Sequence, residues 1–124
     1  MAKILIVDDD PSMVALLAAV ARGEGFEPVS AGDALQGSSL AIREQPALVI
    51  TDMQMPAGGG RALMQRLHAN ARTRHIPLMV VTGTVDASHE EELRQAGASG
   101  VVFKPVDPAK FGAAIRAILG PRQS

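Results

Sequence analysis

Residues 48–56, Leu-Val-Ile-Thr-Asp-Met-Gln-Met-Pro, decide the fold that we expect for this chain. The apolar run at residues 47–50 has the length and the β-branched content of a strand buried on both faces. It leads into the carboxylate Asp52, and Pro56 then ends the strand because proline cannot donate to a β-ladder. An acid at the carboxyl end of a central strand lies where open α/β sheets bind ligands. A lone aspartate there would equally serve as a turn cap, so the other strand ends must decide.

Composition narrows the classes of function. The 124 residues suffice for one domain with a core, and 47% of them are hydrophobic, which excludes a disordered chain. A net charge of −1 without a basic block, together with 2% aromatic residues, argues against nucleic-acid binding. The absence of cysteine excludes disulfides, thiolate metal sites and thiol catalysis. With no signal-peptide pattern and no apolar run long enough to span a bilayer, we expect a cytoplasmic protein that makes no membrane contact.

Strand-like and helix-like segments alternate along the chain. We expect strands at residues 4–7, 28–30, 47–50, 77–81 and 101–103, and helices that begin near residues 11, 33, 58, 86 and 107. Asp10, Asp107 and either Asp86 or Ser88 are expected to cap helices. This α/β alternation predicts a five-stranded parallel sheet, doubly wound, with five helices on its two faces and right-handed crossovers. Residues 1–124 are expected to form one domain.

Polar side chains follow four of the predicted strands: Asp8 and Asp9, Asp52, Thr82, and Lys104. The carboxyl ends of parallel strands share one edge of the sheet, so these groups are expected to converge. Three carboxylates close together cannot all ionise without a large energetic cost. A hard divalent cation relieves the repulsion, and oxygen ligands without histidine or cysteine favour Mg²⁺. The alternative, a purely structural ion pair between Lys104 and Asp52, leaves the Asp8-Asp9 pair unexplained.

Taken together, these motifs resemble the response-regulator receiver domain of two-component signalling. The resemblance covers essentially the whole chain and rests on residues 4–10 (Ile-Leu-Ile-Val-Asp-Asp-Asp), residues 52–56 with Gly60, Thr82, and Lys104-Pro105. Each motif is weak alone, but the ordered set is specific. The resemblance implies a flavodoxin-like strand order of 2-1-3-4-5 and a cis peptide bond between Lys104 and Pro105.

The resemblance also implies roles for the acidic residues. Asp52 would be the phosphoacceptor. Mg²⁺ would be held by Asp9, Asp52 and the backbone carbonyl of Gln54, while Asp8 would act mainly through bound water. Such a domain signals by a transient acyl phosphate, which the same site can hydrolyse with a water molecule in line.

Two further residues and the partners follow from the same resemblance. Thr82 would bond one phosphoryl oxygen and Lys104 another, which offsets the charge spread over the transferring group. The phosphoryl donor would be a sensor histidine kinase or a histidine phosphotransfer protein. A downstream protein is expected at the face formed by the helix after residue 86, the strand at residues 101–103 and the last helix. No output domain follows that helix, which leaves open both a stand-alone regulator and a part of a longer protein.

Rival functions lack residues that they need. A phosphatase of the haloacid-dehalogenase type places an acid two residues after its nucleophile, where this chain has Gln54. A dinucleotide-binding domain needs a glycine-rich loop after its first strand, where residues 8–11 are Asp-Asp-Asp-Pro. The glycines at residues 58–60 resemble part of that motif, but Leu63 stands where its last glycine belongs. A pseudo-receiver that binds partners without phosphorylation remains the alternative, which the complete set of acceptor residues disfavours.

The three histidines do not form a zinc site. His89 and the glutamate after it match the start of a zinc-binding motif, but Leu93 replaces the second histidine. His68 and His75 are isolated, and we predict that they lie on the surface.

One position departs from the family pattern. Receivers usually carry tyrosine or phenylalanine three residues before the lysine, where this chain has Val101. The nearest aromatic residue, Phe103, is two residues on and faces the same side of its strand. Valine is stiff at χ1 and has no large inward and outward rotamers to exchange. We therefore expect phosphorylation to change the downstream face less than an aromatic switch would, with the loop after Thr82 contributing.

Two polar side chains are expected to influence the lifetime of the phosphorylated state. Gln54 and Thr84 each lie two residues after a site residue, where a side chain can overhang the path of the attacking water. Their polar character leaves that path open, so we expect hydrolysis that is neither blocked nor unusually slow.

Overall fold

Five strands and five helices alternate in the computed structural model, which describes residues 1–54, 59–83 and 86–121. The strands are β1 (Lys3–Val7), β2 (Glu27–Ala31), β3 (Leu48–Asp52), β4 (Leu78–Thr82) and β5 (Gly100–Phe103). The helices are α1 (Pro11–Gly23), α2 (Ala34–Glu44), α3 (Gly59–Ala69), α4 (Ala87–Gln95) and α5 (Pro108–Leu119). Each element falls within a few residues of its predicted position. Met55, Pro56, Gly58 and Thr84, which the sequence analysis used, lie outside the described residues.

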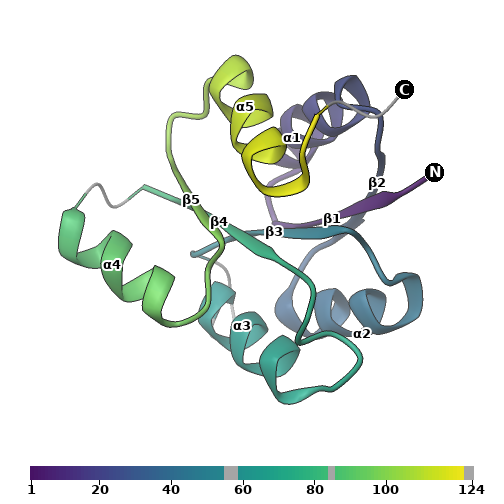
Figure 1. Cartoon of the computed structure of the whole chain (residues 1–124), viewed down its shortest axis with the longest axis vertical. Coiled ribbons are helices and arrows are strands. Elements are labelled where there is room, and N and C mark those ends of the chain that lie inside the picture. Colours follow the sequence, from purple (N-terminus) through teal and green to yellow (C-terminus); the bar gives the residue numbers. More distant parts are fainter. Residues whose placement is uncertain (55–58, 84–85, 122–124) are drawn as a thin grey trace.

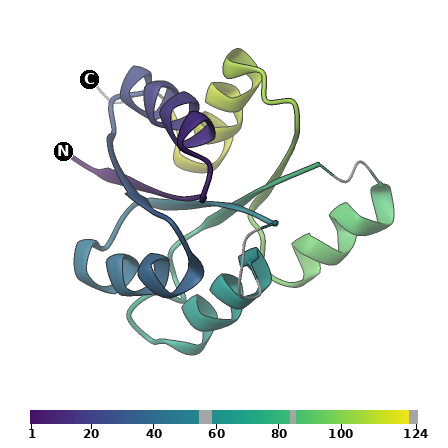
Figure 2. The same ribbon diagram turned by 180° about the vertical axis from the view of Figure 1, so that it is seen from behind.

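The strands form one parallel sheet in the order β2-β1-β3-β4-β5. Helices α1 and α5 cover one face of the sheet, while α2 and α3 cover the other and α4 lies beside β5 (Figure 1). The reverse view in Figure 2 shows the same two layers of helices. The predicted doubly wound architecture and strand order are confirmed. Within the described residues, no helix is both long and apolar enough to span a membrane.

The core is divided by the sheet into two layers, because alternate side chains of a strand point to opposite faces. Ile4 and Ile6 of β1 pack in the layer that contains Phe111 of α5. Leu5 and Val7 pack in the opposite layer, against α2 and α3. Every residue of β3 and β4 is buried, as the continuous apolar runs predicted. The two central strands are therefore held from both sides, and their carboxyl ends are fixed in place.

Aspartates begin four of the helices. Asp10, Asp33, Asp86 and Asp107 each have extended backbone angles and accept a hydrogen bond from an N–H in the first turn of their helix. Asp86, rather than Ser88, is thus the cap of α4. Each such cap contributes about 1 kcal/mol to stability. These caps set where the chain leaves a strand end and enters a helix.

The layered core predicts a sharp difference between two substitutions. Phe111 is fully buried between α5 and the sheet, so Phe111→Ala should lower the free energy of unfolding by about 3–5 kcal/mol. Leu35, on the outer surface of α2, is 62% exposed, and Leu35→Ala should change it by no more than about 0.5 kcal/mol. Urea unfolding of both variants measures this, and equal losses would contradict the packing described.

Candidate functional site

Four strand ends bring the predicted site residues together at one edge of the sheet. Asp8 and Asp9 follow β1, Asp52 ends β3, Thr82 ends β4 and Lys104 follows β5. One carboxylate oxygen from each of the three aspartates lies within 4.8 Å of the other two. Asp8 and Asp52 are buried, while Asp9 is exposed to solvent. The convergence expected from the parallel sheet is therefore present, with one carboxylate open to solvent.

Both side-chain oxygens of Asp52 have partners. The backbone N–H of Gln54 donates to Oδ1 at 3.1 Å, and the Lys104 ammonium contacts Oδ2 at 3.0 Å. The side chain of Gln54 itself is exposed. The Lys104-Pro105 peptide bond is cis, as the resemblance implied. Asp52 is thus held in one orientation by a backbone donor and one cation.

Gly60 lets the start of α3 approach the end of β3 closely. A side chain at this position would place its Cβ 3.0 Å from the backbone oxygen of Asp52 and 3.0 Å from Sδ of Met53. The backbone N–H of Gly60 also donates to the carbonyl of Met53 at 3.3 Å. The absence of a side chain at residue 60 therefore contributes to the position of Asp52.

Asp8 carries an electrostatic cost in this structure. Its Oδ1 accepts from the backbone N–H of Asp10 at 2.9 Å, while its buried Oδ2 has no hydrogen-bond partner among the described residues. Burial raises the pKa of the Asp8 carboxyl above its ordinary value, and the charges of Asp52 and Asp9 raise it further. The hydrogen bond from Asp10 and the charge of Lys104 lower this pKa, but the net shift is upward. Three carboxylates thus face one ammonium, an excess of negative charge that a divalent cation would offset.

The Thr82 hydroxyl contacts a residue whose role the sequence analysis missed. Thr82 is 1% exposed, and its Oγ1 lies 3.4 Å from Nε2 of His89 in the first turn of α4. In the sequence, His89 stands out only as a fragment of a zinc motif. Thr82 ends β4 and His89 lies in α4, so no sequence period links them. By contrast, His68 and His75 lie on the surface as predicted.

The model of the response regulator receiver domain family matches residues 4–116. The chain belongs to this family. It is a receiver domain of two-component systems, whose members accept a phosphoryl group and relay a signal. The phosphorylation-independent alternative is not favoured.

Three similar proteins illustrate the relationship. The DNA-binding response regulator MtrA of Mycolicibacterium smegmatis is 38% identical over 118 residues, which cover 94% of this chain and 50% of MtrA. The polar-differentiation response regulator DivK of Brucella anthropi is 28% identical, covering 95% of this chain and 96% of DivK. The chain therefore spans about half the length of MtrA and nearly the whole of DivK.

The third protein shares the fold. It is the receiver domain of a sensor histidine kinase from Pseudomonas aeruginosa, with a TM-score of 0.85 at 23% identity over 96% of this chain and 98% of that one. In that domain a magnesium ion is coordinated in the active-site cleft.

The strained carboxylate predicts the effect of Asp8→Asn in metal-free buffer. The folded protein binds the Asp8 proton more tightly than the unfolded chain does, because the pKa is raised. Ionisation of Asp8 therefore destabilises the folded protein. The effect grows as the pH rises from 3.8, the ordinary pKa of the carboxyl, through the raised pKa of Asp8 in the folded protein. At neutral pH, Asp8→Asn should stabilise the protein by on the order of 1 kcal/mol. This advantage should disappear in acid.

Thermal unfolding in EDTA, measured from acid to neutral pH, tests this expectation. Asp9→Asn is the matched control, because Asp9 is exposed and should give a smaller gain. A destabilised Asp8→Asn variant at neutral pH would show that the buried carboxylate is satisfied.

Proposed function

We propose that residues 1–124 form one receiver domain in which Asp52 accepts a phosphoryl group from a sensor histidine kinase or a histidine phosphotransfer protein and relays the signal by a conformational change, in the cytoplasm. The observation that carries the proposal is the setting of Asp52. Its carboxylate is buried, oriented by Gln54 N–H and Lys104, and lies beside two further carboxylates. Such a group is poised to act as a nucleophile toward phosphorus.

The transfer step is a displacement at phosphorus. An oxygen of Asp52 forms the new O–P bond as the N–P bond of the donor phosphohistidine breaks, and the freed imidazole leaves. Charge on the transferring group is spread over three oxygens, so catalysis consists mainly of positioning and charge neutralisation. Lys104, already 3.0 Å from Asp52, supplies one positive charge to a phosphoryl oxygen. Thr82, at the end of the neighbouring strand, supplies a hydroxyl donor to another.

Mg²⁺ fits the remaining groups. The donors are all oxygens, three carboxylates lie together, and Asp8 Oδ2 is buried without a partner among the described residues. We assign Asp9, Asp52 and the backbone carbonyl of Gln54 as ligands, with Asp8 acting through bound water. When bound, the ion neutralises negative charge on the phosphoryl oxygens. A magnesium ion is also coordinated in the active-site cleft of the similar Pseudomonas aeruginosa domain, which supports Mg²⁺ as the ion.

Signalling also requires that the acyl phosphate be hydrolysed and that a downstream protein bind the domain. We propose that water hydrolyses the acyl phosphate in the same site, with the exposed side chain of Gln54 beside its path. A downstream protein would bind the face formed by α4, β5 and α5. The half-buried side chains of Val101 and Phe103 lie on β5 at this part of the molecule.

Mg²⁺ should stabilise the folded protein by mass action. At ten times its Kd, the gain is about 1.4 kcal/mol, which raises Tm by several degrees. Asp9→Asn should abolish the gain. Asp33→Asn is the control, because it removes one charge from a helix cap outside the acidic cluster, where asparagine caps equally well. Thermal melts with and without millimolar Mg²⁺ measure the effect, and an unchanged native Tm would argue against the metal site.

Asp52 should become phosphorylated by acetyl phosphate, in a reaction that requires Mg²⁺. Intact mass should increase by one phosphoryl group in the native protein and in Asp33→Asn. Asp52→Asn should show no increase, because it lacks the nucleophilic carboxylate. A mass gain that persists in Asp52→Asn would assign the acceptor to another residue.

A further inference from the structure

Helix α4 is held to the rest of the molecule by few apolar contacts. Of its residues 87–95, all of which the structure describes, Leu93 alone is buried. A second contact, the ion pair of Arg61 on α3 with Glu92, is exposed to solvent. Exposed ion pairs contribute little to stability. The orientation of the first turn of α4 therefore depends on any polar contact made there.

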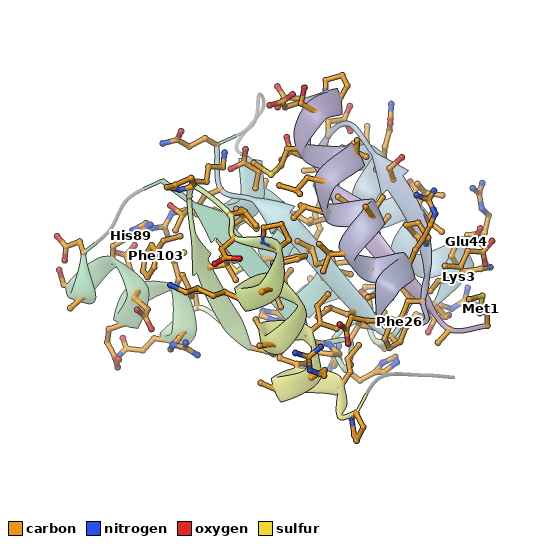
Figure 3. All side chains as sticks on the ribbon, turned by 90° about the horizontal axis from the view of Figure 1, so that it is seen from above. Met1, Lys3, Phe26, Glu44, His89 and Phe103 are labelled. Atoms are coloured by element: carbon orange, nitrogen blue, oxygen red, sulfur yellow. The ribbon has the colours of Figure 1, made fainter. Side chains whose placement is uncertain are left out.

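His89 makes such a contact, and it does so with a site residue. Its Nε2 lies 3.4 Å from the Thr82 hydroxyl, and its ring is half-buried. Figure 3 shows His89 near the start of α4, on the same side of the molecule as Phe103. The backbone of Thr82 is fixed, because its carbonyl accepts from Lys104 N–H at 2.8 Å and its Cα pairs with Phe103. A rotation about χ1 of Thr82 changes the direction of its hydroxyl without moving the strand.

A hydroxyl has only one proton to donate. That proton can point to Nε2 of His89 or to a phosphoryl oxygen on Asp52, but not to both. At 3.4 Å the contact with His89 is longer than a typical hydrogen bond, so it is readily exchanged for a bond to a charged acceptor. Phosphorylation would therefore remove the Thr82 proton from His89.

We infer that His89 is the residue through which α4 responds to phosphorylation of Asp52. In the unphosphorylated protein, the tautomer of His89 without a proton on Nε2 accepts from Thr82 and holds the first turn of α4 to the end of β4. When Thr82 donates to the phosphoryl group, His89 loses that donor and the first turn is released. This inference rests on the proposed function and adds to it a coupling residue outside the reacting groups.

The packing of Val101 explains why α4 needs such a contact. Val101 packs against the core layer that includes Leu93 and Ala98, and its β-branched side chain has no large alternative position. Val101 therefore cannot swing between an inward and an outward position in response to Thr82, as an aromatic ring could. His89 connects Thr82 to α4 directly, without passing through β5.

Nuclear magnetic resonance of the whole chain with Mg²⁺ and beryllofluoride, a phosphoryl mimic, tests the inference. In the native protein, the ¹⁵N resonance of His89 Nε2 should shift on adding beryllofluoride, and so should the amides of α4. The ring of His75, which is exposed and belongs to the segment between α3 and β4, should not respond. A merely structural histidine would not change its Nε2 signal in this way.

Variants then separate coupling from chemistry. His89→Phe keeps a ring but removes the nitrogen, so Asp52 should still gain mass from acetyl phosphate while the α4 amide shifts are largely lost. His89→Gln keeps a polar group and should restore part of them, and His75→Phe should resemble the native protein.

Two results would overturn the inference in distinguishable ways. If beryllofluoride perturbs the Asp52 and Gln54 amides but leaves His89 Nε2 and α4 unchanged, His89 does not couple and the proposed function stands. If neither beryllofluoride nor acetyl phosphate modifies Asp52, both proposals fail together.

Discussion

Repulsion among three carboxylates at one edge of the sheet is the constraint on which the rest of this structure depends. The parallel pairing of β1 with β3 brings Asp8, Asp9 and Asp52 together at one edge, and their proximity opposes folding. The fold tolerates this repulsion because β1 and β3 are buried neighbouring strands whose positions are fixed. The ammonium of Lys104, which follows β5, also offsets part of the negative charge at Asp52. The unligated protein thus keeps a charge imbalance that a cation and a phosphoryl group would share. Apolar packing of the strands thus holds the three carboxylates together despite their electrostatic repulsion.

The strand order determines how firmly each residue of the site is held. Asp52 ends a central strand with layers of side chains on both faces, so it cannot move far. Thr82 ends the next strand, and its hydroxyl meets a helix that has a single buried residue. The rigid side of the site is therefore Asp52, and the side that contacts a loosely held helix is Thr82. A small rotation of one hydroxyl is enough to connect the two.

The fold and the acidic cluster were predictable from sequence because both follow from local signals. Buried strands appear as continuous apolar runs, and polar residues directly after them must share an edge. The contact of Thr82 with His89 was not predictable, since the two residues lie in different elements and no periodic pattern connects a strand end to the following helix. The same holds for the ion pair of Glu24 and Arg116, at 2.6 Å, which joins the ends of α1 and α5 across 92 residues. Only the assembled structure brings such partners together.

Gly60 shows how a residue without a side chain can limit which substitutions the site tolerates. Any larger residue would press on the backbone that carries Asp52, and a backbone atom cannot turn aside as a flexible side chain can. The mutational freedom of residue 60 is therefore limited by the backbone of Asp52, eight positions earlier, although Gly60 itself offers no reactive group. The restriction comes from backbone atoms, so it would persist with another side chain at residue 52. Tolerance to substitution at residue 60 is thus decided by the space beside a strand end and not by the chemistry of the residue itself.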